Sequence, residues 1–283
     1  MKKYAVLSMD IEDWYHLDYF REKHVNVSYS MLDGINNYIS ILESHDIKTT
    51  FFTLGEIADS QKHILRNIFE NGHEIASHGW SHQRPLTMNL VDFIADIKKT
   101  KEKLEQIIGN EVVGYRAPCF SMNRDLLNEV KQSGFKYDSS KIDFSSHPLY
   151  GGIDIHDFKE IYKDIYLKEN FIEFEVSTLP IFRNPVPVSG GGYLRIFPWM
   201  IMNTLIKKYL EKSNLFILYI HPFELSLSSN PELPPDIPWY VEKRFTFGRN
   251  TVKSKLNKLI KLLKQFNYEF TTFSDLHKDL INR

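Results

Sequence analysis

Short apolar runs alternate with helix-periodic segments along most of the chain. Compact apolar runs predict buried strands at residues 4–9, 49–54, 74–76, 112–115 and 215–220. Apolar residues spaced three or four apart predict helices at residues 35–42, 60–70, 91–108, 124–133, 199–211 and 251–265. This repeated alternation favours an α/β architecture with mainly parallel strands.

Residues from about 139 to 198 interrupt the alternation. The segment is rich in aromatic residues and includes Gly151-Gly152, Pro185, Pro187 and Gly190-Gly191-Gly192. We expect a long insertion over the mouth of the barrel-like core. Because the chain shows no internal repeat and no linker-like stretch, residues 1–283 are interpreted as a single domain.

Composition and charge exclude several classes of protein. The 283 residues are 42% apolar and 25% charged, as in a globular protein, and the net charge of −1 gives no bulk attraction for nucleic acid. A single cysteine, Cys119, excludes an intramolecular disulfide and a cysteine-based zinc site. The apolar runs at 4–9 and 215–220 are far shorter than the roughly 20 residues that cross a bilayer. We expect a soluble, cytoplasmic protein, with the inner face of the membrane as an alternative location.

Two histidines four residues apart give the strongest local signal for chemistry. His78 and His82 follow the predicted strand at 74–76. Imidazoles at positions i and i+4 face the same side of one helical turn, so both could bind one cation at about 2.0–2.1 Å. The alternative is a pair of surface histidines in a loop.

Acidic residues close the first predicted strand. The carboxyl ends of parallel strands share one face, so Asp10, Glu12 or Asp13 could meet the histidines there. Two imidazoles and one carboxylate leave a hydrolytic zinc ion an open position for water. Strand alternation puts Asp10 and Glu12 on one face, which favours Glu12 over Asp13 as the metal carboxylate. The acidic residues could also merely cap the strand.

Two later predicted strands end in groups suited to catalysis. Arg116 follows the run at 112–115, and His221 follows the run at 215–220. A guanidinium can hold a carboxylate, and a histidine at a strand end can act as a general acid. Each residue alone is more often structural, and it is their joint occurrence at strand ends that favours a catalytic site.

The order of these motifs resembles the NodB-type polysaccharide deacetylases, carbohydrate esterase family 4. The resemblance rests on Asp10-Ile11-Glu12-Asp13, His78 to His82, Arg116-Ala117-Pro118, Tyr137-Asp138-Ser139-Ser140 and Leu218 to His221. It implies a distorted (β/α)7 barrel. The segments Asp10 to His16, Tyr137 to Ser140, Gly190 to Arg195 and His221 to Glu224 are similar to a bacterial subfamily associated with exopolysaccharide biosynthesis and exosortase loci.

The resemblance implies a role for each motif residue. A divalent ion, most often zinc with nickel or cobalt as alternatives, would be held by His78, His82 and Glu12, or by Asp13 in place of Glu12. Asp10 would be the general base and Arg116 would fix it. His221 would protonate the departing amine and would be tuned by Asp138. A backbone N–H near Cys119 would stabilise the oxyanion.

Candidate substrate contacts follow from the same motifs. Aromatic faces suit pyranose rings and arginine suits anionic groups, so a sugar cleft is expected to be lined by Trp14, Tyr15, His16, Trp80, Cys119, Tyr193 and Arg195. Each of these residues alone is more often a packing residue. Cys119 stands where the family has an aromatic residue, and a catalytic thiol is disfavoured because the sequence has no Cys–His–Asn pattern.

The leading hypothesis is a metal-dependent hydrolase that removes an N-acetyl group from an N-acetylhexosamine of a bacterial polysaccharide or its precursor. The alternatives are hydrolysis of another amide or ureide C–N bond on the same fold, and a non-catalytic glycan-binding module. The partner is therefore a carbohydrate, and the sequence leaves open whether it is a polymer, a lipid-linked sugar or a nucleotide sugar.

Overall fold

Seven parallel strands form the centre of the computed structural model, which describes residues 2–144, 149–181 and 184–282. The sheet order is β11-β1-β2-β3-β4-β5-β8-β7-β6. The parallel strands are β1 (Lys3–Ile11), β2 (Thr50–Thr53), β3 (Glu74–Ser77), β4 (Gly114–Tyr115), β5 (Tyr137–Asp138), β8 (Phe171–Phe174) and β11 (Leu215–Ile220). An eighth parallel strand, β12 (Tyr268–Phe270), lies off this path and pairs with the beginning of β1.

Irregular backbone links the two ends of the parallel sheet. After β8 in the chain, the antiparallel strands β9 (Thr178–Ile181) and β10 (Asn184–Pro187) form a small separate ladder. On either side of this ladder, Ser177 Oγ accepts from the Ile217 N–H at 3.0 Å and the Ser189 carbonyl accepts from the Tyr219 N–H at 3.0 Å. The curled sheet therefore approaches a closed barrel, and the expected distorted (β/α)7 fold is confirmed.

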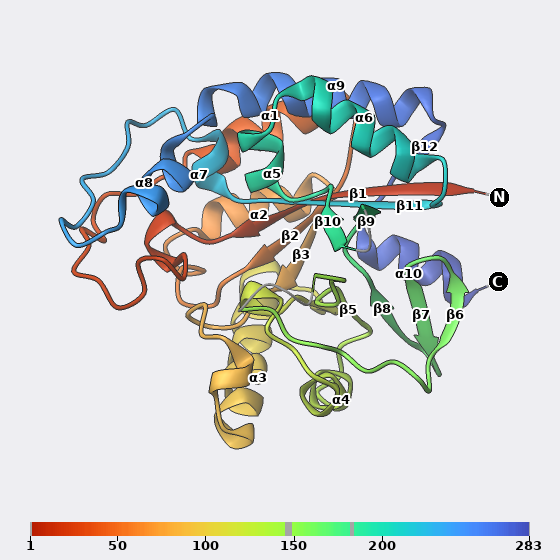
Figure 1. Cartoon of the computed structure of the whole chain (residues 1–283). Helices are drawn as coiled ribbons and strands as arrows, with labels where there is room; N and C mark the ends of the chain where they lie inside the picture. Colours follow the sequence, from red (N-terminus) through yellow and green to blue (C-terminus); the bar gives the residue numbers. More distant parts are fainter. Residues whose placement is uncertain (1, 145–148, 182–183, 283) are drawn as a thin grey trace.

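Helices surround the sheet (Figure 1). In Figure 1, α1, α6 and α9 lie above β1 and β11, α10 lies below them, and α3 and α4 flank the opposite end of the sheet. The long helices are α1 (Gly34–Ser44), α2 (Lys62–Glu70), α3 (Leu90–Ile108), α4 (Arg124–Gln132), α6 (Trp199–Leu210), α8 (Trp239–Thr246), α9 (Val252–Gln265) and α10 (Phe273–Ile281). The short ones are α5 (Gly191–Ile196), α7 (Pro222–Leu225) and the 3-10 turns η1 (Trp14–His16), η2 (Pro85–Thr87), η3 (Pro118–Phe120) and η4 (Arg249–Thr251).

The local signals in the sequence explain where several elements begin and end. All six residues of β11 are buried, as expected for a parallel strand covered on both faces. Asn123 caps α4 by accepting from the Leu126 N–H, and Gly109 ends α3 with a left-handed φ of 69°. The predicted strands and helices at these positions are confirmed.

The segment 139–198, expected to lie over the mouth of the barrel, contributes strands to the sheet itself. Its residues Phe171–Phe174 form β8, which lies in register beside β5, and β6 (Lys159–Tyr162) and β7 (Ile165–Lys168) extend the sheet beyond it. All four residues of β8 are buried. The aromatic and polar residues around this strand mask its short apolar pattern, so it could not be predicted as a separate strand.

Helices able to span a bilayer are absent from the described part of the chain.

Candidate active site

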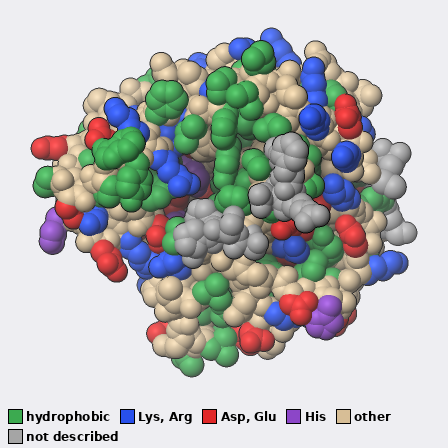
Figure 2. All heavy atoms as spheres, viewed as in Figure 1, with side chains coloured by type: hydrophobic (Ala, Val, Ile, Leu, Met, Phe, Trp, Pro, Cys, Tyr) green, Lys and Arg blue, Asp and Glu red, His purple; other side chains and the backbone are tan. Residues whose placement is uncertain are grey.

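The carboxyl ends of β1, β3 and β11 open into one cleft. Its polar lining comes from Asp10, Glu12, His78, His82, His221 and Glu224. Its aromatic lining includes Tyr19, Phe120, Tyr150, Tyr193, Tyr219 and Phe223. Figure 2 shows histidine side chains within a hollow, beside basic and hydrophobic side chains. The cleft thus combines titratable groups with aromatic walls.

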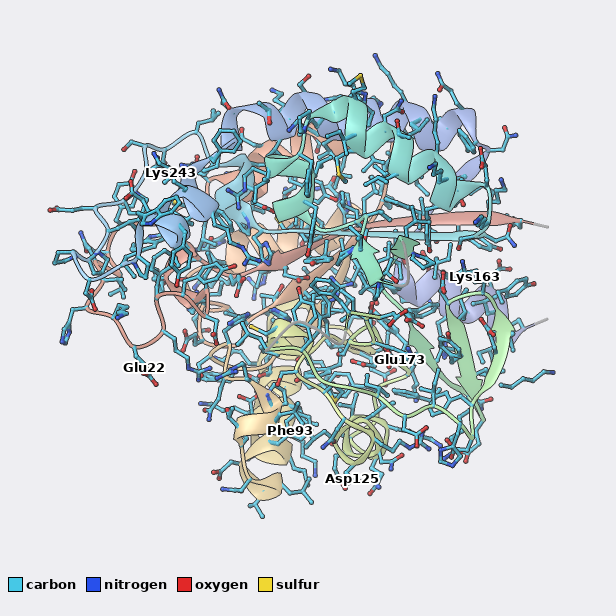
Figure 3. The ribbon with its side chains drawn as sticks, in the orientation of Figure 1. Glu22, Phe93, Asp125, Lys163, Glu173 and Lys243 are labelled. Atoms are coloured by element: carbon cyan, nitrogen blue, oxygen red, sulfur yellow. The ribbon has the colours of Figure 1, made fainter. Side chains whose placement is uncertain are left out.

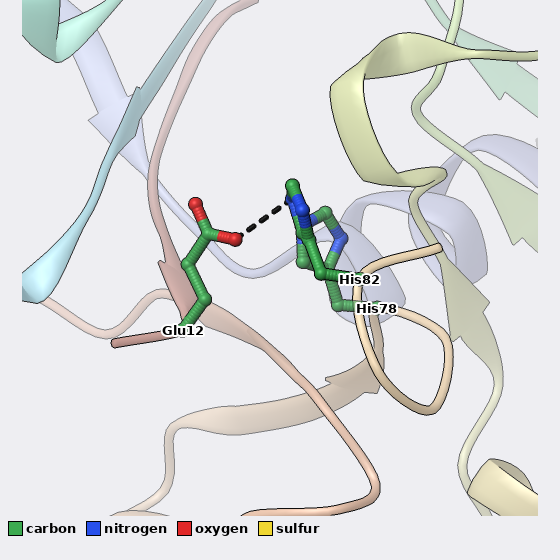
Figure 4. A group of neighbouring side chains, drawn as sticks. All are labelled: Glu12, His78 and His82. Carbon is green, nitrogen blue, oxygen red and sulfur yellow. Dashed lines mark ion pairs between the residues drawn. The ribbon is translucent and has the colours of Figure 1, made fainter. Parts of the chain in front are cut away.

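Glu12, His78 and His82 form a compact group at the bottom of the cleft (Figure 4). One ligand atom from each residue lies within 4.8 Å of the others, and all three side chains are buried. Glu12 Oε2 lies 2.7 Å from His82 Nε2. Burial alone would raise the pKa of Glu12, but the imidazoles of His82, His221 and His78 lower it to about 2. Glu12 is therefore a charged carboxylate beside two ring nitrogens.

The two histidines come together on a loop and not on a helical turn, so the loop backbone brings their rings to one place. The loop follows β3, and its turns use left-handed backbone at Gly79 (φ 74°) and His82 (φ 57°). The His78 Nδ1–H donates to the Arg116 carbonyl at 2.9 Å, which leaves His78 Nε2 as the nitrogen able to bind a cation. Burial lowers the pKa of His78 to about 4, so the ring is neutral.

This donor set fits a divalent transition metal. Two imidazoles and one carboxylate are a ligand set typical of hydrolytic zinc sites, and three protein ligands leave a position for water. Asp13 lies elsewhere: its Oδ1 accepts from the Trp14 and Met31 N–H groups at 2.8 and 2.9 Å and caps η1. The geometry therefore brings Glu12, and not Asp13, to the histidines.

Asp10 is held by a buried arginine on the neighbouring wall of the cleft. Arg116 Nη1 donates to Asp10 Oδ1 and to Ser8 Oγ, both at 2.7 Å. Its Nε donates to the Ser139 carbonyl at 3.1 Å, and its guanidinium carbon lies 4.0 Å from the centre of the Phe52 ring. Arg116 is fully buried, so this ion pair is shielded from solvent and fixes Asp10 at the edge of the cleft.

His221 lies between two carboxylates. Its Nε2 is 3.3 Å from Glu12 Oε1, and its Nδ1 is 3.5 Å from Glu224 Oε2. Burial alone would lower the pKa of His221, but Glu224 and Glu12 raise it to about 9. His221 is therefore a protonated imidazolium at the edge of the cleft, suited to donate a proton.

The predicted partnership of His221 with Asp138 is wrong. Asp138 is fully buried on β5 and accepts from Ser140 Oγ at 2.8 Å and from the Ser140 N–H at 3.0 Å. Its neighbour is the carboxyl group of Glu173 on β8. Figure 3 shows Glu173 inside the molecule, in contrast to the acidic residues Glu22 and Asp125 at the periphery. Sequence reasoning missed Glu224 as the partner of His221. The signal was the i, i+3 spacing from a strand-end histidine into a short helix.

The predicted substrate-binding residues divide into two groups. Cys119, Tyr193 and Arg195 line the cleft. The other four are outside the cleft lining and have structural contacts: they are Trp14, Tyr15, His16 and Trp80. Their placement as sugar contacts is therefore not supported.

The contacts of three of these four residues explain their position. Trp14 is fully buried and donates to the Tyr29 carbonyl at 2.7 Å. His16 Nε2 lies 2.6 Å from Glu56 Oε1. Trp80 packs against Gly55 and lies under the ammonium group of Lys99, which is 3.3 Å from the ring centre. These aromatic rings stabilise the loops around the cleft.

Cys119 lies in a strained turn beside the cleft. Cys119 and Phe120 have successive left-handed φ values of 53° and 52°, which non-glycine residues rarely adopt. Burial raises the pKa of the Cys119 thiol far above its usual range, so a thiolate nucleophile is disfavoured. Cys119 therefore lines this wall with a buried thiol that is not suited to act as a nucleophile.

Comparison with known proteins separates the chain into two matched segments. Residues 27–137 match the family "Polysaccharide deacetylase", and residues 139–278 match a domain of unknown function, DUF3473. The peptidoglycan deacetylase of Helicobacter pylori is 26% identical over 41% of this chain and 40% of its own length. The peptidoglycan-N-acetylglucosamine deacetylase of Bacillus cereus is 31% identical over 33% of this chain and 34% of its own length. The chain thus spans well under half of these relatives.

The fold has counterparts among solved structures over its whole length. A protein from Mycobacterium smegmatis that is assigned to the polysaccharide deacetylases superposes with a TM-score of 0.66 and 19% identity. The match covers 99% of this chain and 91% of that one. At this level of identity the likeness concerns the fold.

Proposed function

We propose that the chain is a metal-dependent N-deacetylase of a glycan, because residues 27–137 match the polysaccharide deacetylase family. The observation that carries the proposal is the group formed by Glu12, His78 and His82, with Asp10 and His221 lining the same cleft. Residues of the second matched segment, His221 and Glu224 among them, complete this site. Both matched segments are therefore needed for the activity.

The metal site would be formed by Glu12 and by the Nε2 atoms of His78 and His82. When bound, a divalent cation would lower the pKa of a nearby water and polarise the amide carbonyl. Asp10 takes the proton of the attacking water as general base. Arg116 fixes the carboxylate of Asp10, because its Nη1 donates to Asp10 Oδ1 at 2.7 Å. The backbone N–H of Cys119 would face the developing oxyanion, since Pro118 has no N–H and the N–H of Phe120 donates to the Ala117 carbonyl at 2.9 Å.

His221 acts as the general acid on the other side of the cleft. Water oxygen adds to the carbonyl carbon, the C–N bond breaks, and the nitrogen takes a proton from His221. The products are acetate and the free amine. The aromatic walls, with Tyr193 and Tyr219 among them, suit the apolar faces of a pyranose ring.

The proposed substrate is an N-acetylhexosamine in a bacterial polysaccharide or its precursor. Two observations support it: the name of the Bacillus cereus relative includes N-acetylglucosamine, and the motifs at 10–16, 190–195 and 221–224 resemble an exopolysaccharide subfamily. We further propose zinc as the metal and the cytoplasm, or the inner face of the membrane, as the location. Another amide or ureide substrate, or glycan binding without catalysis, remains the competing function.

Metal content and acetate release test the proposal together. Purified protein is stripped, reloaded with zinc and dialysed beside His78→Ala. We expect about one zinc ion per chain in the wild type and little in the variant, because each imidazole is one of only three protein ligands. The zinc-loaded wild type should release acetate from N-acetylglucosamine oligomers.

Each competing function has its own outcome. One zinc ion without acetate release from glycans, but with release of amine from a cyclic amide, would select the other C–N hydrolase. Glycan binding without zinc or turnover would select a binding module.

A further inference from the structure

Two segments that are far apart in the sequence meet at His221. These are Gly190 to Arg195, which includes α5, and His221 to Glu224, which begins α7. Glu224 is 1% exposed, and its Oε2 accepts from the backbone N–H of His221 at 3.1 Å. The same oxygen lies 3.5 Å from the imidazole Nδ1 of His221. One carboxylate thus faces both the main chain and the ring of the proposed acid.

Gly191 provides the space for this carboxylate. A Cβ atom on Gly191 would lie 1.8 Å from Glu224 Oε2, so any side chain would displace the carboxylate. The φ of Gly191 is outside the left-handed region, so the backbone itself does not demand glycine there. Close approach of Glu224 is therefore the physical reason for glycine at this position.

Arg195 holds the other oxygen of Glu224. Its Nε lies 3.4 Å from Glu224 Oε1, and its Nη1 donates to the carbonyls of Phe245 and Phe247 at 3.0 and 2.9 Å. Arg195 is 4% exposed. The end of α8 therefore fixes the guanidinium, and the guanidinium compensates the charge of a fully buried carboxylate.

We propose that Glu224, fixed by Arg195 and accommodated by Gly191, is the positioning residue of His221. The carboxylate lies at ion-pair distance from Nδ1 of His221, 3.5 Å away, and orients the ring so that Nε2 can give its proton to the leaving nitrogen in the cleft. The inference rests on the deacetylase function proposed above. It gives Glu224 the role that the sequence motif assigned to Asp138, whose oxygens bind Ser140 on another wall of the barrel.

Two substrates separate positioning of the acid from general damage. Breaking the amide bond of an N-acetylglucosamine oligomer requires protonation of the leaving nitrogen. Breaking the ester bond of 4-nitrophenyl acetate does not, because nitrophenolate leaves as the anion. In zinc-loaded Glu224→Gln, we expect kcat for the amide to fall about 10- to 100-fold with KM and zinc content unchanged. Turnover of the ester should stay within about threefold of the wild type.

A spectroscopic readout tests the contact directly. The Nδ1–H proton resonance of His221, assigned by its loss in His221→Ala, should move upfield in Glu224→Gln, because a neutral amide oxygen accepts more weakly than a carboxylate. The control is Glu102→Gln, an exposed substitution on α3, which should change none of these quantities.

Three outcomes are distinguishable. Wild-type kcat for the amide in Glu224→Gln would overturn the inference, and so would equal losses with amide and ester. Absence of zinc binding or of acetate release in the wild type would overturn the proposed function instead.

A double substitution keeps the test valid where Glu224→Gln folds poorly. Gly191→Ala should reduce amide turnover in the wild-type background, because the new methyl group displaces the carboxylate. In the Glu224→Ala background it should cause no further loss. Losses that multiply in the double variant would show that Gly191 acts independently of Glu224 and would contradict the inference.

Discussion

Two pairs of buried carboxyl groups lie near the ends of parallel strands, in opposite electrostatic settings. Asp10 and Glu12 line the cleft, and Asp138 and Glu173 lie on β5 and β8. None of the four is more than 2% exposed. Yet the pKa of Glu12 is lowered to about 2, whereas burial raises the pKa of Asp138 to about 6 and that of Glu173 well above its usual range.

The neighbours of each pair explain this difference. Asp10 is paired with Arg116, and Glu12 faces three imidazoles. The second pair accepts mainly from a hydroxyl and from backbone N–H groups of residues 140 and 141, and its two members face each other. Cationic or metal-binding neighbours keep a buried carboxylate charged, whereas a second carboxyl favours retention of a proton. The neighbouring groups, and not the degree of burial, thus distinguish the pair in the cleft from the structural pair.

The largest effect is expected from Glu12→Gln. A neutral amide is a poor ligand, so zinc affinity should fall by more than about 100-fold, since loss of even an outer partner of a ligand costs about 10- to 100-fold. Acetate release should be lost with it. Metal titration by competition with a chelator, beside an acetate assay, measures both. Undiminished zinc affinity would remove Glu12 from the ligand set and return Asp13 to consideration.

Asp10→Asn should distinguish the role of Asp10 as a base from the role of Glu12 as a metal ligand. We expect kcat to fall about 10²- to 10⁴-fold through loss of the general base, while one zinc ion per chain is retained. Arg116 would then face a neutral amide, so unfolding temperature should also fall. Parallel loss of zinc in Asp10→Asn would show that Asp10 is a ligand and that the distinction between base and ligand is wrong.

Glu173→Gln should have the smallest effect of the three substitutions, and it should stabilise the folded protein. Raised carboxyl pKa values mean that the folded state holds protons more tightly than the unfolded state. Their stabilising effect is complete below about pH 4 and is lost as pH rises through about 6 and beyond. The neutral amide removes the Glu173 part of this loss and keeps an oxygen to accept from residues 140 and 141. The variant should therefore melt about 2–5 °C higher than the wild type at pH 8.

The pH dependence is the decisive part of that measurement. The difference in melting temperature between Glu173→Gln and the wild type should be larger at pH 8 than at pH 5, and kcat should be unchanged. A difference that is independent of pH would show that the glutamate does not retain a proton in the folded protein.

The sequence was most informative where a strand delivers its chemistry directly. Asp10, Glu12, His78, Arg116 and His221 stand at or just after strand ends, and a parallel sheet brings such positions to one face whatever the loops do. The α/β fold and the cluster of candidate residues could therefore be predicted from local patterns.

The sequence was least informative where contacts depend on distant segments. The pairing of His221 with Glu224 needs the space left by Gly191, which comes from another part of the chain. Aromatic residues close to the motifs, such as Trp14 and Trp80, pack against loops. The cleft is lined instead by aromatic residues outside the motifs, such as Tyr19 and Tyr150. Which aromatic residue faces a cleft is decided by tertiary packing, which spacing along the chain does not encode.

Arg116 connects the proposed base and a proposed ligand through a single residue. Its side chain holds Asp10, and its own carbonyl accepts from His78 Nδ1. A small displacement at the end of β4 would carry both groups with it and leave their separation nearly constant. The distance between Asp10 and His78 should therefore change little when the barrel fluctuates. Thermal motion of the surrounding loops should alter access to the cleft more than the geometry inside it.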